Sequence, residues 1–129
     1  MPVIGWRALR TPEPHSDYVV MASRLPLRRH RSVPTFLRLT WSVTRQLGRS
    51  EGLVGYALDA QLGAKTFWTL SAWESRAALD RFARAEPHAG VMRALQPKMG
   101  ATRFLTWTAR GEALPPSWDE ARQRLAAAG

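Results

Sequence analysis

One histidine, His88, is spaced from nearby apolar residues so that its ring faces an apolar interior. In "FARAEPHAGVMRAL" (82–95) it begins a helical segment after a proline, and it shares one helix face with Val91 and Leu95. Two interpretations follow. Either the imidazole is a core group hydrogen-bonded to a backbone carbonyl, or it lines a pocket as a base, a proton shuttle or an axial ligand of haem.

Two arginines are candidates for binding an anionic part of a ligand. Arg24 ends a predicted strand, and Arg93 lies on the same helical segment as His88. A guanidinium binds a carboxylate, a phenolate or a haem propionate, although the ordinary role of such a side chain is a solvated surface position. The candidate catalytic residues are therefore His88, Arg93 and Arg24.

Tryptophan is unusually frequent in this chain, which has six tryptophans in 129 residues. Such side chains either fill an ordinary core or line a cleft that suits a flat polycyclic or conjugated ligand. For a cleft between helices and sheet, the candidate lining residues are Phe36, Trp41, Tyr56, Trp68, Trp73, Phe82 and Met92.

Several kinds of site have no signature here. The chain contains no cysteine, and His15, His30 and His88 lack a second ligand one helical turn away, so we predict no metal site. The serines lack the context of a nucleophile elbow, and no glycine-rich phosphate loop occurs.

The net charge of +9 raises the question of nucleic acid, with its densest cluster in "RLPLRRHR" (24–31). The remaining arginines are dispersed and no nucleic-acid-binding motif is present, so nucleic acid is not the expected partner. No run of about 18 apolar residues occurs, and the first fifteen residues lack the apolar stretch of a signal peptide. We expect a cytoplasmic protein without a membrane span.

The pattern of elements predicts a ferredoxin-like α+β fold, β-α-β-β-α-β, with a C-terminal helical tail. Residues 1–16 are expected to be irregular, with "VIGWRAL" able to pair as an edge strand, followed by a domain over 17–112 and the tail over 113–129. The predicted strands and helices are 17–25 (strand), 33–48 (helix), 52–60 and 65–73 (hairpin), 76–86 and 87–96 (helices) and 102–110 (strand).

Both faces of the predicted four-stranded antiparallel sheet are apolar. Along 65–73, Phe67 and Trp73 face one way, whereas Trp68 and Leu70 face the other. With helices on one face only, a monomer would leave the second face exposed to water. We therefore expect a homodimer packed through the sheet faces.

The run "GLVGYALDAQLGAKTFWTLSAWESRAALDRFARAEPHAGVMRAL" (52–95) resembles the dimeric α+β barrel superfamily of antibiotic-biosynthesis-type monooxygenases. Its "FWTLSAWES…ALDRF…PH..VM" pattern is most similar to small bacterial proteins related to spheroidene monooxygenase. The superfamily includes cofactor-free quinone-forming oxygenases, haem-degrading enzymes and proteins without known activity, so the resemblance implies the fold more strongly than a reaction.

The resemblance also implies where haem-degrading relatives place their tryptophan and their histidine ligand. On this chain those positions fall on Phe82 and Met92, and the asparagine of that constellation is missing because the chain contains no asparagine. If His88 binds iron, it does so one helical turn earlier than in those relatives.

Three functions follow. The first is a monooxygenase-like enzyme of secondary metabolism that acts on an aromatic or conjugated substrate in the helix–sheet cleft, without a cofactor, with His88 and an arginine assisting formation of a substrate anion. The second is a haem-binding protein or haem-dependent enzyme with His88 as axial ligand. The third is a non-catalytic ligand-binding or interaction protein.

Overall fold

The computed structural model describes residues 3–128 and contains one antiparallel five-stranded sheet. Its strands, in the spatial order β1-β3-β4-β2-β5, are β1 (Val3–Ala8), β2 (Asp17–Pro26), β3 (Leu53–Gln61), β4 (Thr66–Trp73) and β5 (Arg103–Arg110). The ferredoxin-like arrangement is confirmed. The sheet has five strands where we predicted four, because β1 pairs with β3; the segment expected to be irregular contains the edge strand that we named as its alternative.

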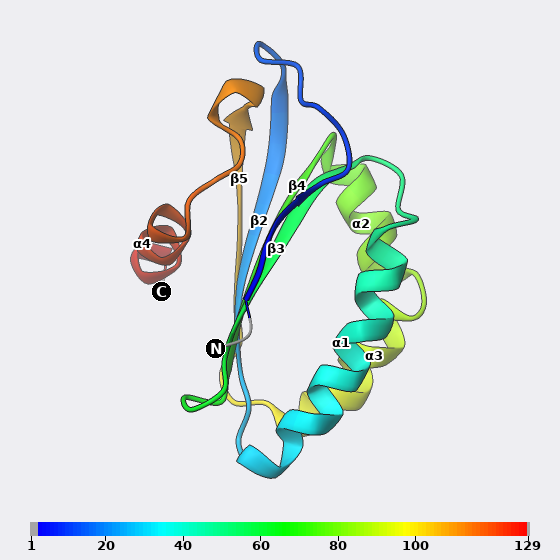
Figure 1. Ribbon diagram of the computed structural model, residues 1–129, viewed down its shortest axis with the longest axis vertical. Coiled ribbons are helices and arrows are strands. Elements are labelled where there is room, and N and C mark those ends of the chain that lie inside the picture. Colours follow the sequence, from blue (N-terminus) through cyan, green and yellow to red (C-terminus); the bar gives the residue numbers. More distant parts are fainter. Residues whose placement is uncertain (1–2, 129) are drawn as a thin grey trace.

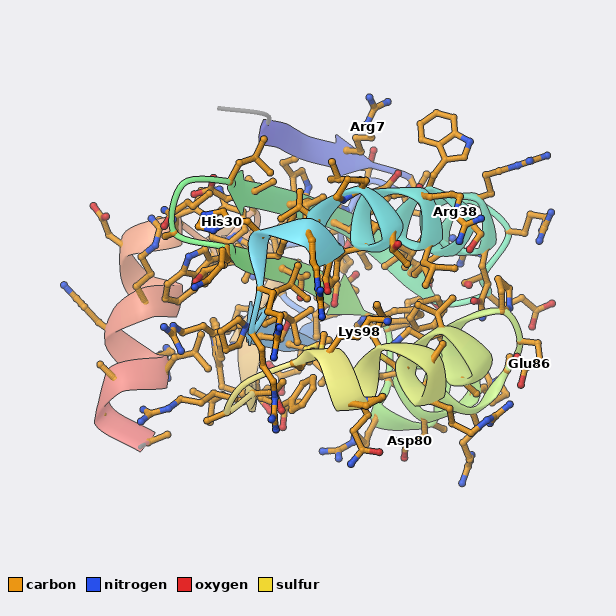
Figure 2. All side chains as sticks on the ribbon, turned by 90° about the horizontal axis from the view of Figure 1, so that it is seen from below. Arg7, His30, Arg38, Asp80, Glu86 and Lys98 are labelled. Carbon is orange, nitrogen blue, oxygen red and sulfur yellow. The ribbon has the colours of Figure 1, made fainter. Side chains whose placement is uncertain are left out.

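The helices lie on both faces of the sheet, not on one as predicted. α1 (Val33–Leu47), α2 (Arg76–Arg84) and α3 (His88–Leu95) cover one face, and α4 (Trp118–Ala128) lies on the other (Figures 1 and 2). We call these the α1–α3 face and the α4 face. Within residues 3–128, every helix is too short or too polar to cross a bilayer.

Local sequence signals explain where these helices begin. The Ser75 hydroxyl accepts a hydrogen bond from the Ala78 amide at 3.1 Å, and the Ser117 hydroxyl accepts one from the Glu120 amide at 3.0 Å. Each hydroxyl satisfies an amide that has no partner within its own helix. In the first helix, Pro34 lies in the opening turn, where its missing N–H costs little.

The alternation of side chains along β4 is confirmed. Phe67 stacks on Phe36 of α1, with ring centroids 4.0 Å apart, whereas Leu70 and Ala72 belong to a core cluster with residues of α4. Consequently the fold has a core on each side of the sheet. The expectation that both faces of the sheet are covered is correct.

The α4 face is covered within the single chain. Val20, Ala22 and Ala72 have no exposed surface, and Ala121 and Leu125 of α4 are buried against the same cluster. Our reason for expecting a dimer was a bare second face, and α4 takes away that reason. The homodimer through sheet faces stays a prediction. In such a dimer, the second copy would have to displace α4 from this surface.

A charged contact helps to hold α4 in place. Arg122 of α4 donates a hydrogen bond to the Asp59 carboxylate of β3 at 2.5 Å, and only 15% of the Asp59 side chain is exposed. The Arg122 guanidinium also lies over the Trp68 ring at 5.1 Å. Arg122→Gln should therefore lower the free energy of unfolding by about 1–3 kcal/mol, because it leaves a largely buried carboxylate without its cationic partner.

Urea unfolding of the variant measures this loss, with Arg93→Gln as the matched control. Arg93 pairs with Glu86 at 3.1 Å, but both side chains are mostly exposed, at 72% and 63%. Such a pair contributes about 0–1 kcal/mol. Equal losses in the two variants would show that the Arg122 contact does not fasten α4.

Candidate functional site

A cavity of about 120 Å³ lies between the α1–α3 face of the sheet and the helices above it. Residues from β2, β3 and β4 form its floor, and side chains of α1, α2 and α3 form its roof. Five of the seven predicted pocket residues line it: Phe36, Tyr56, Trp73, Phe82 and Met92. His88 lines the same cavity, so the structure brings the candidate base and most of the predicted aromatic residues together.

The ring of His88 is half-buried and has a defined hydrogen-bond partner. Its Nδ1 lies 2.9 Å from the carbonyl oxygen of Ala83, and its ring packs against Phe82 with centroids 4.7 Å apart. Because a carbonyl only accepts, Nδ1 carries the proton and donates. In the neutral imidazole, Nε2 is then the acceptor. The backbone-carbonyl partner and the pocket position, which we treated as alternatives, occur together.

Gln46 of α1 positions the start of the histidine helix, and sequence reasoning missed it. Its Oε1 accepts a hydrogen bond from the His88 amide at 2.8 Å, and its Nε2 donates to the Phe82 carbonyl at 3.3 Å. One amide side chain thus joins the end of α2 to the beginning of α3. Gln46 is only 6% exposed. Its role could have been predicted from the sequence, because a polar residue beside the apolar face of a helix often hydrogen-bonds to a neighbouring element.

The buried face of α1 is rotated from the one that we expected. Phe36 points into the cavity as predicted and Val43 also lines it, but the face widens on the side of Leu39 and Gln46, which is the side of α3. Part of the opposite flank is exposed to solvent. Trp41 is 68% exposed and does not line the cavity, so its assignment to the pocket is corrected.

Three other predicted residues also lie outside the cavity. Trp68 and Arg24 are on the α4 face, where the Arg24 guanidinium lies 5.7 Å from the Trp68 ring centre. Side chains alternate along a strand, so Trp68 cannot share a pocket with Trp73. Arg93 lies on the outer side of α3 and pairs with Glu86. Neither arginine lines the inner cavity with His88, so that part of the predicted constellation is corrected, although Arg93 lines the hollow just outside it.

Hydroxyl groups supply nearly all the other polarity of the cavity. Ser23 and Thr69 hydrogen-bond to each other across β2 and β4. The Ser71 hydroxyl accepts the Trp73 indole N–H at 2.9 Å. Among the described residues, no arginine and no carboxylate lines the cavity. His88 supplies the cavity with an imidazole nitrogen that can accept a proton, and Tyr56 adds a phenol.

The cavity opens beside β5, the edge strand. Phe104 of β5 lines it although 55% of that residue is exposed, and Met92 of α3 stands on the other side. Both residues also line an outer hollow of about 560 Å³, which includes Arg28, Arg93 and Gln96. The buried cavity therefore continues into a wider and more polar surface depression.

Haem is too large for the enclosed cavity alone. The His88 ring is oriented by a backbone carbonyl, an arrangement that is also common for metal-binding histidines. However, an apolar space of about 150 Å³ holds a single benzene-sized ring, and this cavity is of about 120 Å³. Four joined pyrrole rings need far more room between Phe82 and the strands.

Comparisons with known proteins agree on the fold. No family model matches the chain, and no curated protein matches it either. Solved structures do. A variant of SnoaB, a cofactor-independent oxygenase from Streptomyces nogalater, superposes with a TM-score of 0.63 at 18% identity, over 78% of this chain and 99% of that one.

Two further structures have the same architecture. An antibiotic biosynthesis monooxygenase superposes with a TM-score of 0.64 at 14% identity, over 70% of this chain and 97% of the other. A conserved protein from Methanosarcina mazei superposes with a TM-score of 0.63 at 16% identity, over 70% and 90%. The chain thus has the ferredoxin-like fold of antibiotic-biosynthesis-monooxygenase-like proteins, as the sequence resemblance implied.

Proposed function

We propose that the protein oxygenates an aromatic or conjugated small molecule in the cavity beneath α1 and α3, without a bound cofactor. The observation that carries this proposal is a mostly apolar cavity with one histidine whose Nδ1 is held by the Ala83 carbonyl, so that Nε2 is left as a base. The fold is shared with a protein described as a cofactor-independent oxygenase, which is compatible with such chemistry.

The shape of the site favours a flat substrate that is only partly enclosed. The inner cavity has room for about one aromatic ring, beside Phe82 and Tyr56. The rest of a fused or conjugated molecule would pass between Phe104 and Met92 into the outer hollow. There the guanidinium of Arg28, whose Nε donates to the Met99 carbonyl at 2.6 Å, faces the more polar end.

The chemistry follows from these groups. Nε2 of His88 takes a proton from an acidic C–H or O–H of the substrate, and the Tyr56 phenol donates a hydrogen bond to the resulting anion. The electron-rich carbanion reacts with dioxygen to form a C–O bond and a peroxide. Cleavage of the O–O bond with loss of water converts a ring CH₂ into C=O, so that CH₂ and O₂ become C=O and H₂O. No external reductant is needed.

Dioxygen uptake tests this function. Protein prepared with a chelator, and shown to lack absorption in the visible range, is mixed with a panel of hydroxylated polycyclic aromatics that contain an activated CH₂. We expect uptake with at least one member, with one carbonyl formed per O₂ consumed. Uptake that requires added iron or haem, or a product without incorporated oxygen, would contradict the proposal.

A non-catalytic binding protein is the second candidate, and one observation favours it. Within residues 3–128, neither an arginine nor a carboxylate joins His88 in the inner cavity, and the imidazole already has a structural partner in the Ala83 carbonyl. In that case, the same aromatic compounds would quench tryptophan fluorescence through Trp73 but would be recovered unchanged. Binding without dioxygen uptake across the panel therefore selects this function.

A further inference from the structure

On the α4 face, one row of paired residues crosses four neighbouring strands. Asp59 on β3 is paired with Trp68 on β4, Trp68 with Arg24 on β2, and Arg24 with Arg103 on β5. The last pair sets two positive charges directly opposite each other. Like charges at such positions repel and destabilise a sheet. This arrangement needs a physical reason.

The acidic residue of the row does not balance these two charges. Asp59 forms its ion pair with Arg122 of α4, at 2.5 Å. Within residues 3–128, neither Arg24 nor Arg103 has a carboxylate within 4.0 Å. Among the residues that the structure describes, three guanidinium groups thus share one carboxylate, which leaves two of the positive charges without an ion pair.

The row borders a hollow on the same face. Its volume is about 360 Å³, and its lining residues are Arg24, Trp68, Arg103, Arg122, Leu125 and Ala126. The Trp68 ring is flanked by the guanidinium groups of Arg24 at 5.7 Å and Arg122 at 5.1 Å. The hollow therefore combines a cationic wall from two strands with the apolar edge of α4.

We propose that this hollow binds an oxyanion of the phosphate class, held between Arg24 and Arg103. A guanidinium presents a planar pair of N–H donors that matches two oxygens of a phosphate, and an anion between the two arginines would replace their repulsion by two attractive contacts. Trp68 makes the site suitable for a phosphate carried by an aromatic group. The site lies on the opposite face of the sheet from the His88 cavity and is independent of the function proposed there.

The alternative to an anion site is a purely structural role for Arg24 and Arg103. Leu125 and Ala126 belong to the last turns of α4, where carbonyl groups carry partial negative charge that attracts arginines. If Arg24 and Arg103 served only this end of the helix, their removal would lower stability to the same extent with and without phosphate. An anion site instead predicts that stability depends on phosphate.

Titration with orthophosphate and with phenyl phosphate, at ionic strength kept constant with sodium chloride, distinguishes these roles. Calorimetry gives the Kd, and thermal unfolding with and without ligand gives the shift in Tm. For the natural chain, we expect both ligands to bind and to raise the Tm. Arg24→Gln and Arg103→Gln should each weaken binding by about tenfold or more, since each removes a charge-assisted contact.

Two further variants serve as controls. Arg38→Gln removes an equal charge from the exposed side of α1 and should leave the Kd unchanged (Figure 2). Arg24→Lys keeps the charge but loses the planar fork, and should bind more weakly than the natural chain even if Arg24→Gln fails to fold. No binding by the natural chain, or equal weakening in Arg38→Gln, would overturn the proposal. A preference for phenyl phosphate would identify an aryl phosphate, and equal affinities would identify the free ion.

Discussion

His88→Asn should reduce dioxygen uptake by about 10²–10⁴-fold, the typical contribution of a positioned acid or base, while the protein still folds. The asparagine amide can donate to the Ala83 carbonyl in place of Nδ1, which lies 2.9 Å from that oxygen in the structure. It offers no group that accepts a proton in place of Nε2. The substitution therefore separates the two roles that the imidazole combines.

The measurement is the initial rate of uptake with the best substrate of the aromatic panel, together with urea unfolding of each variant. His30→Asn is the matched control, because His30 is an exposed histidine whose Nε2 also lies near a backbone carbonyl, that of Gly63 at 3.2 Å. It should retain full activity. We expect His88→Asn to lose less than about 1.5 kcal/mol of stability. An active His88→Asn protein would exclude His88 as the base.

Trp73→Ala should lower the free energy of unfolding by about 3–5 kcal/mol, as large core truncations do. Trp73 has no exposed surface, its ring lies 5.2 Å from that of Phe82, and its indole N–H donates to the buried Ser71 hydroxyl at 2.9 Å. Removing it would leave a void beneath α2 and one hydroxyl without its donor. Such a loss is a large part of the total stability of a small domain.

Trp41→Ala is the matched control, since it deletes the same side chain from a position that is 68% exposed. Its effect should stay within about 0.5 kcal/mol. Chemical denaturation of the two variants, with equal m-values, measures the difference directly. A comparable loss in Trp41→Ala would show that this tryptophan is buried in solution, for example by a second copy of the chain.

Local patterns determined the order and bounds of most elements. Strand alternation predicted both faces of β4, and the predicted ranges begin within one residue of the starts of α1, α2 and α3, since these signals depend only on neighbours in the chain. The position of His88 on the inner side of α3 likewise followed from helical spacing. The resemblance to monooxygenase-like proteins correctly implied the fold.

The assignment of side chains to one site could not follow from such local signals. Because side chains alternate along β2, Arg24 faces the opposite side of the sheet from Ser23 and Leu25. The alternation does not say which of these two sides faces α1 and α3. Likewise, the apolar stripe of α1 widens towards α3, where Gln46 is buried, and leaves Trp41 in water. That choice depends on which neighbour packs on each flank.

The sequence by itself therefore determined the four central strands β2 to β5, the helices, the two apolar faces of the sheet and the inward turn of His88. Only the tertiary structure decided that α4 covers the second face, that Arg24 and His88 lie on opposite faces, and that Gln46 joins α1 to the start of α3. The physical reason is that periodicity specifies relative directions within one element, whereas contacts between distant elements depend on how their surfaces pack together.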